Sequence, residues 1–367
     1  MRILHINSYY YMSTFYKNLF EKQIDIGLDI SVYVPIAKGT NASAFNFGEY
    51  TTISANHGKY DRVIFHLKHI KILNDILKKY QIKSFDIIHA HSLFSNGYIA
   101  YRLKQIYGIP YVLAVRNTDV NTFFKHMVHL RRLGVKILKE AEKIVFLSQP
   151  YRDIVINKYL PDNLKAEILA KTIVIPNGID DFWIKNRGTV KSVPTGKRIK
   201  LIYAGVVNKN KNLLITIKVI ELLKQRGFDI QFTVVGRVVD KNIYNRIICL
   251  PYVRYFPPVS KEELINIYRA NDIFIMPSRT ETFGLVYAEA MSQGLPVIYT
   301  KGQGFDGQFK EGVVGHHVDC SNVEEIADRV ADVVDNYECL SENCLKLCNE
   351  FNWGLLAQEY KTVYLDF

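Results

Sequence analysis

A chain of 367 residues with 48% hydrophobic and 23% charged residues has the composition of a soluble globular protein and is too long for one ordinary core, so we expect two domains. No apolar run approaches the roughly 20 residues needed to cross a bilayer. The opening residues, Met1–Ile6, read as a strand without the features of a signal peptide, and we expect a cytoplasmic protein.

The net charge of +11 is concentrated in the first half of the chain. Residues 1–185 hold 25 Lys and Arg against 15 Asp and Glu, whereas the remainder holds 22 against 21. This asymmetry indicates an anionic partner for the first half, either a membrane surface or a phosphorylated or acidic acceptor. We expect no nucleic acid as partner, because no nucleic-acid-binding module is recognisable.

The first half alternates short apolar runs with longer amphipathic stretches. Because the runs are apolar without a two-residue alternation, they predict buried parallel strands at Ile3–Ile6, Ile30–Val34, Ile87–Ala90, Tyr111–Val115 and Ile144–Leu147. Helical patterns lie at Asn96–Tyr107 and Phe123–Ala141. The segment Ala37–Arg62 is unperiodic and is predicted to be an irregular loop.

A polar segment with the composition of a linker, Lys185–Lys197, precedes a second series of this kind. Helices are expected to start near Lys211, Lys261 and Leu285, between strands at Ile199–Ala204, Ile230–Val235, Ile273–Met276 and Pro296–Tyr299. Two such series predict an α/β protein with two Rossmann-like, doubly wound domains that face each other across a cleft. Ligands of these sheets bind beyond the carboxyl ends of the strands.

The turn after the strand Ile273–Met276 carries the clearest functional pattern. A helix is expected from Leu285 through Ser292, with Thr280 or Thr282 as its cap, and Gly284 allows a ligand to approach the backbone. Free N–H groups at a helix start suit phosphate or sugar oxygens, and carboxylates accept paired hydrogen bonds from vicinal hydroxyls. On placement alone, a capped helix with a surface glutamate explains the turn equally well.

The whole segment Pro277–Met291, with its two glutamates at Glu281 and Glu289, resembles the Glu-x7-Glu region of glycosyltransferase family 4, whose members are retaining enzymes with the GT-B fold. The resemblance implies that Glu281 lies by the transferred sugar and that Glu289 binds the nucleotide ribose. It also implies that the backbone of Phe283, Gly284 and Leu285 holds sugar hydroxyls and phosphate.

Other segments resemble the family in the expected order. Tyr203–Gly205 and the following Asn210–Asn212 are similar to its phosphate-binding turn, which implies that Gly205 and Lys211 contact the donor diphosphate. Pro258–Leu264 looks like the base-side turn, with Val259 as the candidate for pairing with the nucleobase. Ile175–Asp180 looks like the end of the N-terminal domain. The resemblance implies an acceptor-binding domain at 1–185, a nucleotide-sugar-binding domain at 186–345 and a helix at 346–367 that crosses back to the first domain.

Two positions depart from the family pattern. Val206 stands where the family usually has Arg, and Gly236–Val238 lacks the second Gly of a frequent Gly-x-Gly turn. The donor diphosphate would lose a bidentate contact at Val206 unless another cation replaces it. The candidates are Lys209, Arg237 and Arg279.

The first domain is expected to hold the acceptor. Asn7–Thr14 has no glycine, which argues against a dinucleotide dehydrogenase, and its Tyr10 and Tyr11 either line the acceptor pocket or pack at the domain edge. The turn at Arg116–Asp119 follows a strand. Asp119 is a candidate for orienting an acceptor hydroxyl, Arg116 for meeting an anionic group, and Asn117 lies between them.

Two further features of the first domain have alternative explanations. His91 follows the strand Ile87–Ala90 and is a candidate catalytic residue, although it and Asp119 also fit caps or satisfied polar groups. Phe123–Lys136 reads as a basic amphipathic helix, which either lies on anionic lipid headgroups or is a domain helix with a solvated basic face.

The resemblance implies transfer of a hexose, with retention, from a nucleotide diphosphate sugar to a hydroxyl acceptor in cell-surface polysaccharide or glycolipid synthesis. Lys211 and the loop at 281–285 would stabilise the departing diphosphate, and the enzyme would be cytoplasmic or peripheral at the inner face of the membrane. No cofactor and no metal is expected, since no Asp-x-Asp pair stands at a strand end. Alternatives are a nucleotide-sugar epimerase of the same fold and a non-catalytic nucleotide- or polysaccharide-binding protein.

Overall fold

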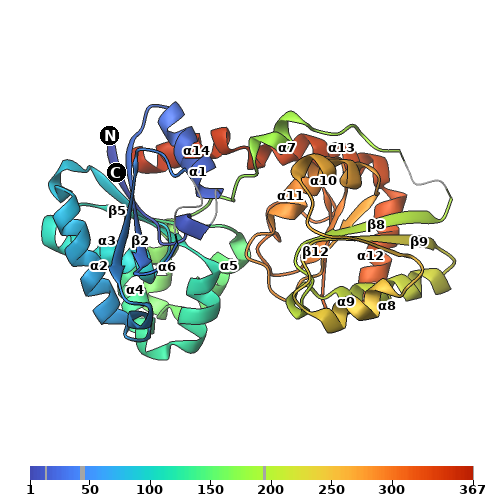
Figure 1. The fold of residues 1–367 in the computed structure, drawn as a ribbon, viewed down its shortest axis with the longest axis horizontal. Helices are drawn as coiled ribbons and strands as arrows, with labels where there is room; N and C mark the ends of the chain where they lie inside the picture. Colours follow the sequence, from blue (N-terminus) through green and yellow to red (C-terminus); the bar gives the residue numbers. More distant parts are fainter. Residues whose placement is uncertain (13–14, 42–45, 193–195, 367) are drawn as a thin grey trace. The chain divides into compact units, whose positions relative to one another are not determined.

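The computed structural model describes residues 1–12, 15–41, 46–192 and 196–366, which form two compact units (Figure 1). The first unit comprises Met1–Leu147, Tyr151–Pro176 and Trp353–Phe367, and the second comprises Ser148–Pro150 and Asn177–Asn352. Residues 13–14, 42–45 and 193–195, which fall in the predicted first turn, the predicted loop and the predicted linker, lie outside the described residues.

The first unit is built on a seven-stranded sheet in which all neighbours are parallel, in the order β3-β2-β1-β4-β5-β6-β7. The chain starts in the middle of the sheet and winds to both edges, which is the doubly wound arrangement. The strands are β1 (Arg2–Ile6), β2 (Asp29–Ala37), β3 (Thr51–His57), β4 (Ile87–Ala90), β5 (Tyr111–Val115), β6 (Lys143–Phe146) and β7 (Thr172–Val174).

Helices cover both faces of this sheet (Figure 1). On one face α1 (Phe15–Asp25) packs against α14 (Trp353–Leu365). The other face carries a row of neighbouring helices, α2 (Phe65–Lys79), α3 (Ser95–Tyr107), α4 (Arg131–Glu140) and α6 (Asp162–Ala170). Since successive strand residues point to opposite faces, Ile3 joins the core under α1 and α14, whereas Leu4 joins the core under α2 and α3.

The second unit has a six-stranded parallel sheet in the order β10-β9-β8-β11-β12-β13. Its strands are β8 (Arg198–Ala204), β9 (Asp229–Val235), β10 (Val253–Phe256), β11 (Ile273–Ile275), β12 (Val297–Thr300) and β13 (Gly315–Val318). One face carries α8 (Leu213–Gln225), α9 (Lys241–Ile248) and α12 (Val323–Asp335), and the other carries α10 (Lys261–Arg269), α11 (Leu285–Met291) and α13 (Tyr337–Leu347) (Figure 1).

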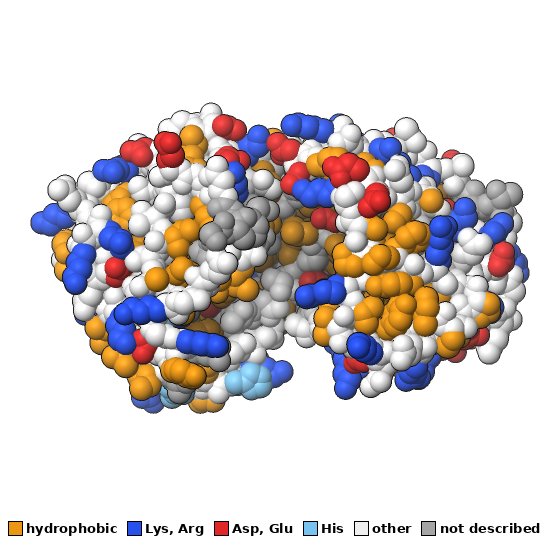
Figure 2. Space-filling view, viewed as in Figure 1, with side chains coloured by type: hydrophobic (Ala, Val, Ile, Leu, Met, Phe, Trp, Pro, Cys, Tyr) orange, Lys and Arg blue, Asp and Glu red, His pale blue; other side chains and the backbone are white. Residues whose placement is uncertain are grey.

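Shorter helices connect these elements. They are η1 (Tyr10–Met12), η2 (Lys59–Val63), η3 (Ile82–Ser84), η4 (Asp119–Phe124), η5 (Val128–Leu130), α5 (Gln149–Ile154), η6 (Val155–Tyr159), α7 (Asp181–Lys185), η7 (Lys209–Lys211) and η8 (Cys348–Phe351). Of the helices that the described ranges contain, none is long and apolar enough to cross a membrane. Each unit mixes hydrophobic and charged side chains on the face drawn in Figure 2.

The predicted α/β fold with doubly wound sheets is confirmed, but two predicted segments are wrong. Ala37–Arg62 contains β3, which no apolar run marks because this edge strand is polar and mostly half-exposed. Phe123–Ala141 is not one helix: η4 ends at Phe124, Met127 leaves the helical region with φ −99 and ψ 66, and α4 begins only at Arg131.

Candidate active site

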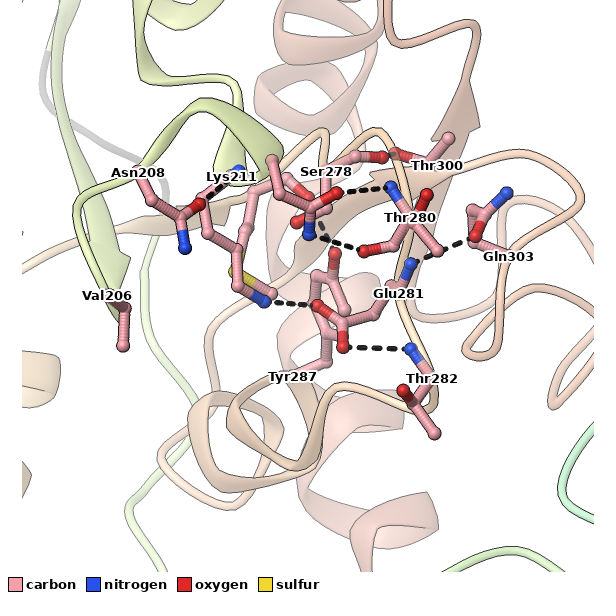
Figure 3. Close-up of polar contacts among 12 residues, drawn as sticks. Val206, Asn208, Lys211, Ser278, Thr280, Glu281, Thr282, Tyr287, Thr300 and Gln303 are labelled. Atoms are coloured by element: carbon pink, nitrogen blue, oxygen red, sulfur yellow. Dashed lines mark hydrogen bonds and ion pairs between the residues drawn. The ribbon is translucent and has the colours of Figure 1, made fainter. Parts of the chain in front are cut away.

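The site in the second unit is built where the turns after β8 and β11 meet (Figure 3). Asn210 joins them: its Nδ2 donates to the Thr280 carbonyl oxygen at 2.7 Å, and its Oδ1 accepts from the Thr280 N–H at 3.1 Å. Its backbone carbonyl also accepts from the Arg279 N–H at 2.8 Å. Two turns 70 residues apart therefore form one hydrogen-bonded platform.

Gly284 is the N-cap of α11 and provides no capping side chain. Its φ of 79° lies in the left-handed region, and a Cβ there would come within 2.4 Å of the Tyr287 ring. The predicted caps, Thr280 and Thr282, are wrong, because Gly284 is the N-cap and makes no side-chain cap hydrogen bond. The first N–H groups of α11 carry the partial positive charge of the helix, and the Glu281 side chain lies beside its N-cap, with its Cγ 3.2 Å from the place of a Cβ on Gly284.

Lys211 and Glu281 form an ion pair between Nζ and Oε2 (Figure 3). Both side chains are largely buried, with exposed fractions of 19% and 11%. The other carboxylate oxygen of Glu281 accepts from the Thr282 N–H at 3.1 Å, and the Glu281 N–H donates to Gln303 Oε1 at 2.9 Å. The backbone of Lys211 is fixed as well, because its N–H donates to Asn208 Oδ1 at 3.0 Å. The pair is therefore fixed from both sides.

The turns after β8 and β9 approach each other through two glycines. A Cβ on Gly236 would lie 1.9 Å from the Gly205 carbonyl oxygen, so only glycine fits. Val206 follows, half-buried, and its carbonyl accepts from the Tyr203 hydroxyl at 2.8 Å. The three cations proposed to replace an arginine at this place, Lys209, Arg237 and Arg279, are all exposed and form no ion pair with the carboxylates that the structure describes.

Glu289 lies on α11, about one turn after its first residue, Leu285. It is half-buried, and burial raises the pKa of its carboxyl to about 7, while the Lys261 charge pulls that pKa down. Lys261 begins α10 and pairs with Asp180 at 2.5 Å. Ser260 caps α10 through a capping box with Glu263, and the half-buried Val259 immediately precedes this cap. The Glu289 carboxyl is thus within electrostatic range of Lys261 at the start of α10.

In the first unit, Asp119 is buried and its carboxylate accepts three backbone N–H groups, from Leu93 at 2.9 Å, Phe94 at 3.1 Å and Arg116 at 2.8 Å. Burial raises the pKa of Asp119 to about 6, against the lowering effect of these donors. With both oxygens engaged, Asp119 joins the turn after β4 to the turn after β5. This geometry favours a positioning role.

Arg116 and His91 are joined through the same turns. Arg116 Nε donates to the His91 carbonyl oxygen at 3.3 Å, and the guanidinium carbon lies 6.0 Å from the centre of the Tyr16 ring. His91 is fully buried among His5, His89 and Phe20. Asn117 is half-buried and accepts from Asn121 Nδ2.

Tyr10 is a core residue. Its hydroxyl donates to the Phe47 carbonyl oxygen at 3.0 Å and lies 3.2 Å from the Tyr50 hydroxyl. The Tyr10 ring packs against the Phe20 ring. Burial raises the pKa of Tyr10 above its usual value. Tyr11 is half-buried beside the same core.

His5, His89 and His91 are close enough to hold a metal ion, but their geometry fits a hydrogen-bonded core better. His5 Nδ1 and His91 Nε2 face each other at 3.0 Å, and the Tyr364 hydroxyl lies 2.6 Å from His89 Nδ1. The His89 and His91 rings stack with an interplanar angle of 19°, so their in-plane lone pairs do not converge on one point. Burial lowers the pKa of all three imidazoles, that of His5 to about 3.

Two family models together match most of the chain. A model of glycosyltransferase family 4 matches residues 12–181, and a model of the glycosyl transferases group 1 matches residues 187–347. The chain belongs to glycosyltransferase family 4. The transferase interpretation is therefore confirmed, and the comparisons give no support to the epimerase alternative.

Relatives of this glycosyltransferase include an uncharacterised glycosyltransferase of Methanocaldococcus jannaschii, 23% identical over 91% of this chain and 96% of the relative. The UDP-Gal:alpha-D-GlcNAc-diphosphoundecaprenol alpha-1,3-galactosyltransferase of Escherichia coli is 25% identical over 82% of this chain and 80% of its own length. A D-inositol 3-phosphate glycosyltransferase of Mycolicibacterium smegmatis is 24% identical, and the match covers 74% of this chain and 64% of the relative.

Solved structures share the GT-B fold of this family 4 glycosyltransferase. The lipopolysaccharide outer core galactosyltransferase WaaB superposes with a TM-score of 0.78 at 13% identity, covering 100% of this chain and 99% of the other. Sucrose-phosphate synthase of Thermosynechococcus elongatus gives 0.76 at 15% identity, covering 100% and 98%. Anabaena HepE in complex with UDP gives 0.69 at 15% identity, covering 100% of both chains.

Residue patterns missed part of the site of this glycosyltransferase. The loop after β12 supplies Gln303 to Glu281, and a Cβ on Gly304 would lie 1.9 Å from the Thr282 carbonyl oxygen. The run of three asparagines at 208, 210 and 212 was a usable signal, since each side chain fixes a turn. No local pattern marked Gln303.

Proposed function

We propose that this glycosyltransferase moves a hexose, with retention, from a nucleotide diphosphate sugar to a hydroxyl of a glycolipid or growing polysaccharide. The observation that carries the proposal is the buried Lys211–Glu281 pair beside the N-terminus of α11. This arrangement presents a cation and free N–H groups to a diphosphate, and a carboxylate to sugar hydroxyls.

In the proposed reaction, the bond between the anomeric carbon and the diphosphate oxygen breaks as the acceptor oxygen bonds to the same face of that carbon. The acceptor proton passes to the leaving phosphate oxygen, so no protein nucleophile is needed. Lys211 and the N–H groups after Gly284 stabilise the charge that develops on the diphosphate. Glu281 holds the transferred sugar, and Glu289 accepts hydrogen bonds from the ribose hydroxyls.

Donor contacts beyond these are assigned to Gly205, Val259, Phe283 and Leu285, with Arg279 as the cation that replaces the arginine absent at Val206. A UDP-sugar is the first donor to test, because the E. coli relative is named for UDP-Gal and the Anabaena structure holds UDP. On the acceptor side we assign contacts to Arg116, Asn117 and Tyr11. Asp119 and the enclosed His91 would then hold the turn that presents Arg116.

We further propose peripheral association with an anionic membrane surface through the first half of the chain, which has a charge balance of +10. The E. coli relative is named for an acceptor linked to diphosphoundecaprenol, which is a lipid. Salt-sensitive sedimentation with phosphatidylglycerol vesicles tests this part. Absence of binding to these vesicles at low salt contradicts it.

The transfer proposal is tested in two steps. A thermal-shift screen of UDP-, GDP- and ADP-sugars first identifies the donor, since a bound ligand raises stability with the logarithm of its concentration over Kd. Release of the nucleoside diphosphate is then measured for Lys211→Ala and Glu281→Ala, with the exposed Lys218→Ala and Glu338→Ala as matched controls. Turnover is expected to be lost in the first two variants only, at unchanged secondary structure. Normal turnover in both Lys211→Ala and Glu281→Ala would contradict the assignment of the site.

A further inference from the structure

A row of large apolar side chains lies exposed along η2 and the first turns of α2. Tyr60, Ile64, Leu67 and Ile70 have exposed fractions of 84%, 59%, 41% and 47%, and we call these four residues the apolar ridge. Leu67 and Ile70, three positions apart, lie on one side of α2, whereas Tyr60 belongs to η2 and Ile64 joins η2 to α2 with an extended backbone at φ −107 and ψ 93. The opposite side of α2 packs Ile72 and Ile76 into the core. Exposed apolar rows of this kind mark interaction surfaces.

The basic segment that the sequence suggested as a lipid-binding helix cannot insert by its own apolar face. In α4 this face is already used: Ile137 and Leu138 are fully buried, and a Cβ at Gly134 would lie 2.6 Å from the Phe94 ring. The exposed positions of α4 are Arg132, Lys136 and Lys139. This helix therefore offers charge, and any apolar contact with lipid has to come from another element.

The first turn of α2, from which part of the apolar ridge projects, packs against the start of this basic segment. The Phe65 ring on α2 lies 6.2 Å from the Phe123 ring, which stacks on Phe94 at 4.7 Å. Beyond Phe123, Val128 is 59% exposed and is flanked by the exposed Lys125 and His129. Hydrophobic, basic and histidine side chains are mixed at the edge of the unit that carries α2 and α4 (Figure 2).

The charge of this surface is strongly one-sided. Residues 64–79 hold four Lys and one Asp, and residues 122–139 hold five Lys and Arg with no Asp or Glu. The two segments thus contribute +8 of the net +11. A second copy docking on this face would bring like charges together, whereas anionic lipid phosphates complement them. The charge favours a lipid surface as the occupant.

We propose that the apolar ridge inserts into the headgroup region of an anionic bilayer while the lysines and arginines of residues 64–79 and 122–139 contact the lipid phosphates. This inference rests on the proposed membrane association and names the surface responsible. An apolar face flanked by basic residues lies in the interface plane, with its side chains buried about 5–10 Å into the boundary.

The first test is the partition coefficient on vesicles of phosphatidylglycerol and phosphatidylcholine. Ile64→Ser/Leu67→Ser is expected to lower it at least tenfold, because both side chains leave water on insertion. Val239→Ser is the matched control, since Val239 is 59% exposed like Ile64 but lies in the second unit. Equal binding by wild type and Ile64→Ser/Leu67→Ser overturns the proposal.

The second test separates charge from insertion. Lys125→Glu/Arg132→Glu is expected to lower binding at least tenfold and flatten its salt dependence, given about fivefold per basic residue at the surface. Lys218→Glu is the charge control in the second unit. Tyr60→Trp is expected to show a blue-shifted emission on anionic vesicles and quenching by brominated lipid. An unshifted emission overturns insertion.

Other outcomes remain distinguishable. Sedimentation that shows a dimer in wild type and a monomer in Ile64→Ser/Leu67→Ser assigns the ridge to a second copy and overturns the lipid assignment. Failure of the transferase proposal appears separately, as absent nucleoside diphosphate release with every donor in detergent solution. Wild-type protein that binds no anionic vesicle overturns both the membrane association and the ridge.

Discussion

The substitution Glu281→Gln is expected to tighten nucleoside diphosphate binding while it abolishes transfer. In the structure Lys211 is engaged by Glu281, so an incoming diphosphate has to compete with this carboxylate for the ammonium group. The amide retains the shape of the side chain but removes its charge. Lys211 is then released for the diphosphate, and the repulsion between the carboxylate and the phosphates disappears.

The magnitude follows from the burial of the pair. A hydrogen bond to a charged group contributes about 1.5–3 kcal/mol, and we take the low end because the two side chains keep exposed fractions of 19% and 11%. About 1.5 kcal/mol corresponds to roughly a tenfold lower Kd. Transfer should fall at least 100-fold, on the order of the loss of one charge-stabilising group in an active site.

Isothermal titration with the nucleoside diphosphate of the identified donor measures this effect in wild type, Glu281→Gln, Lys211→Met and the double variant. The gain in affinity should vanish in the Lys211→Met background, because no ammonium group is left to release. The exposed Glu338→Gln should change nothing. Unchanged or weaker binding by Glu281→Gln would refute the competition between carboxylate and diphosphate.

Five further predictions concern other residues of the second unit and the metal requirement. Because burial raises the pKa of Glu289 to about 7, nucleotide affinity should fall up to about tenfold per pH unit below 7 and lose this dependence in Glu289→Gln. The same raised pKa means that the folded state binds more protons than the unfolded state between about pH 4.5 and 7, so the free energy of unfolding of the unliganded protein falls as pH rises through this window. In thermal melts, the Tm of Glu289→Gln should therefore increase relative to that of wild type as pH rises. Val206→Arg should lower the donor KM about tenfold by restoring a bidentate phosphate contact, and an unchanged KM would show that another cation already fills this place. Gly236→Ala should cost about 2–4 kcal/mol in urea unfolding because its Cβ meets a backbone oxygen, against about 1 kcal/mol for Gly302→Ala, which meets nothing within 4 Å. Removing divalent metals with EDTA should leave turnover unchanged, since Lys211 supplies the positive charge, and a loss restored by Mg²⁺ would contradict this.

The central strands of both sheets were predictable because they are buried on both faces and read as continuous apolar runs. The edges were not: β3 and β10 each pair with one neighbour, β3 is mostly polar and half-exposed, and β10 has only four residues and is interrupted by the exposed Arg254. The break before α4 was hidden because the amphipathic pattern continues through Met127, where the backbone leaves the helix.

In the candidate site, motif spacing was sufficient to select Lys211, Glu281 and Glu289 as residues of interest. The contacts that hold them were out of reach of sequence patterns, since Asn210 meets Thr280 and Gln303 meets Glu281 across long stretches of chain. The predicted cap of α11 was wrong for a local reason. Two threonines precede this helix, but the left-handed Gly284 separates them from its first turn.

Apart from the short segment Ser148–Pro150, the second unit is one continuous stretch, Asn177–Asn352, inserted between Pro176 and Trp353 of the first unit. The returning helix α14 is integral to the first core: Trp353 packs on Phe15, and the Tyr364 hydroxyl accepts from Gln23 Nε2 and meets His89. During synthesis the second unit can therefore complete its core while the first, although made earlier, still lacks a helix. The core of the first unit can be completed only after α14, the last helix to be synthesised, is available.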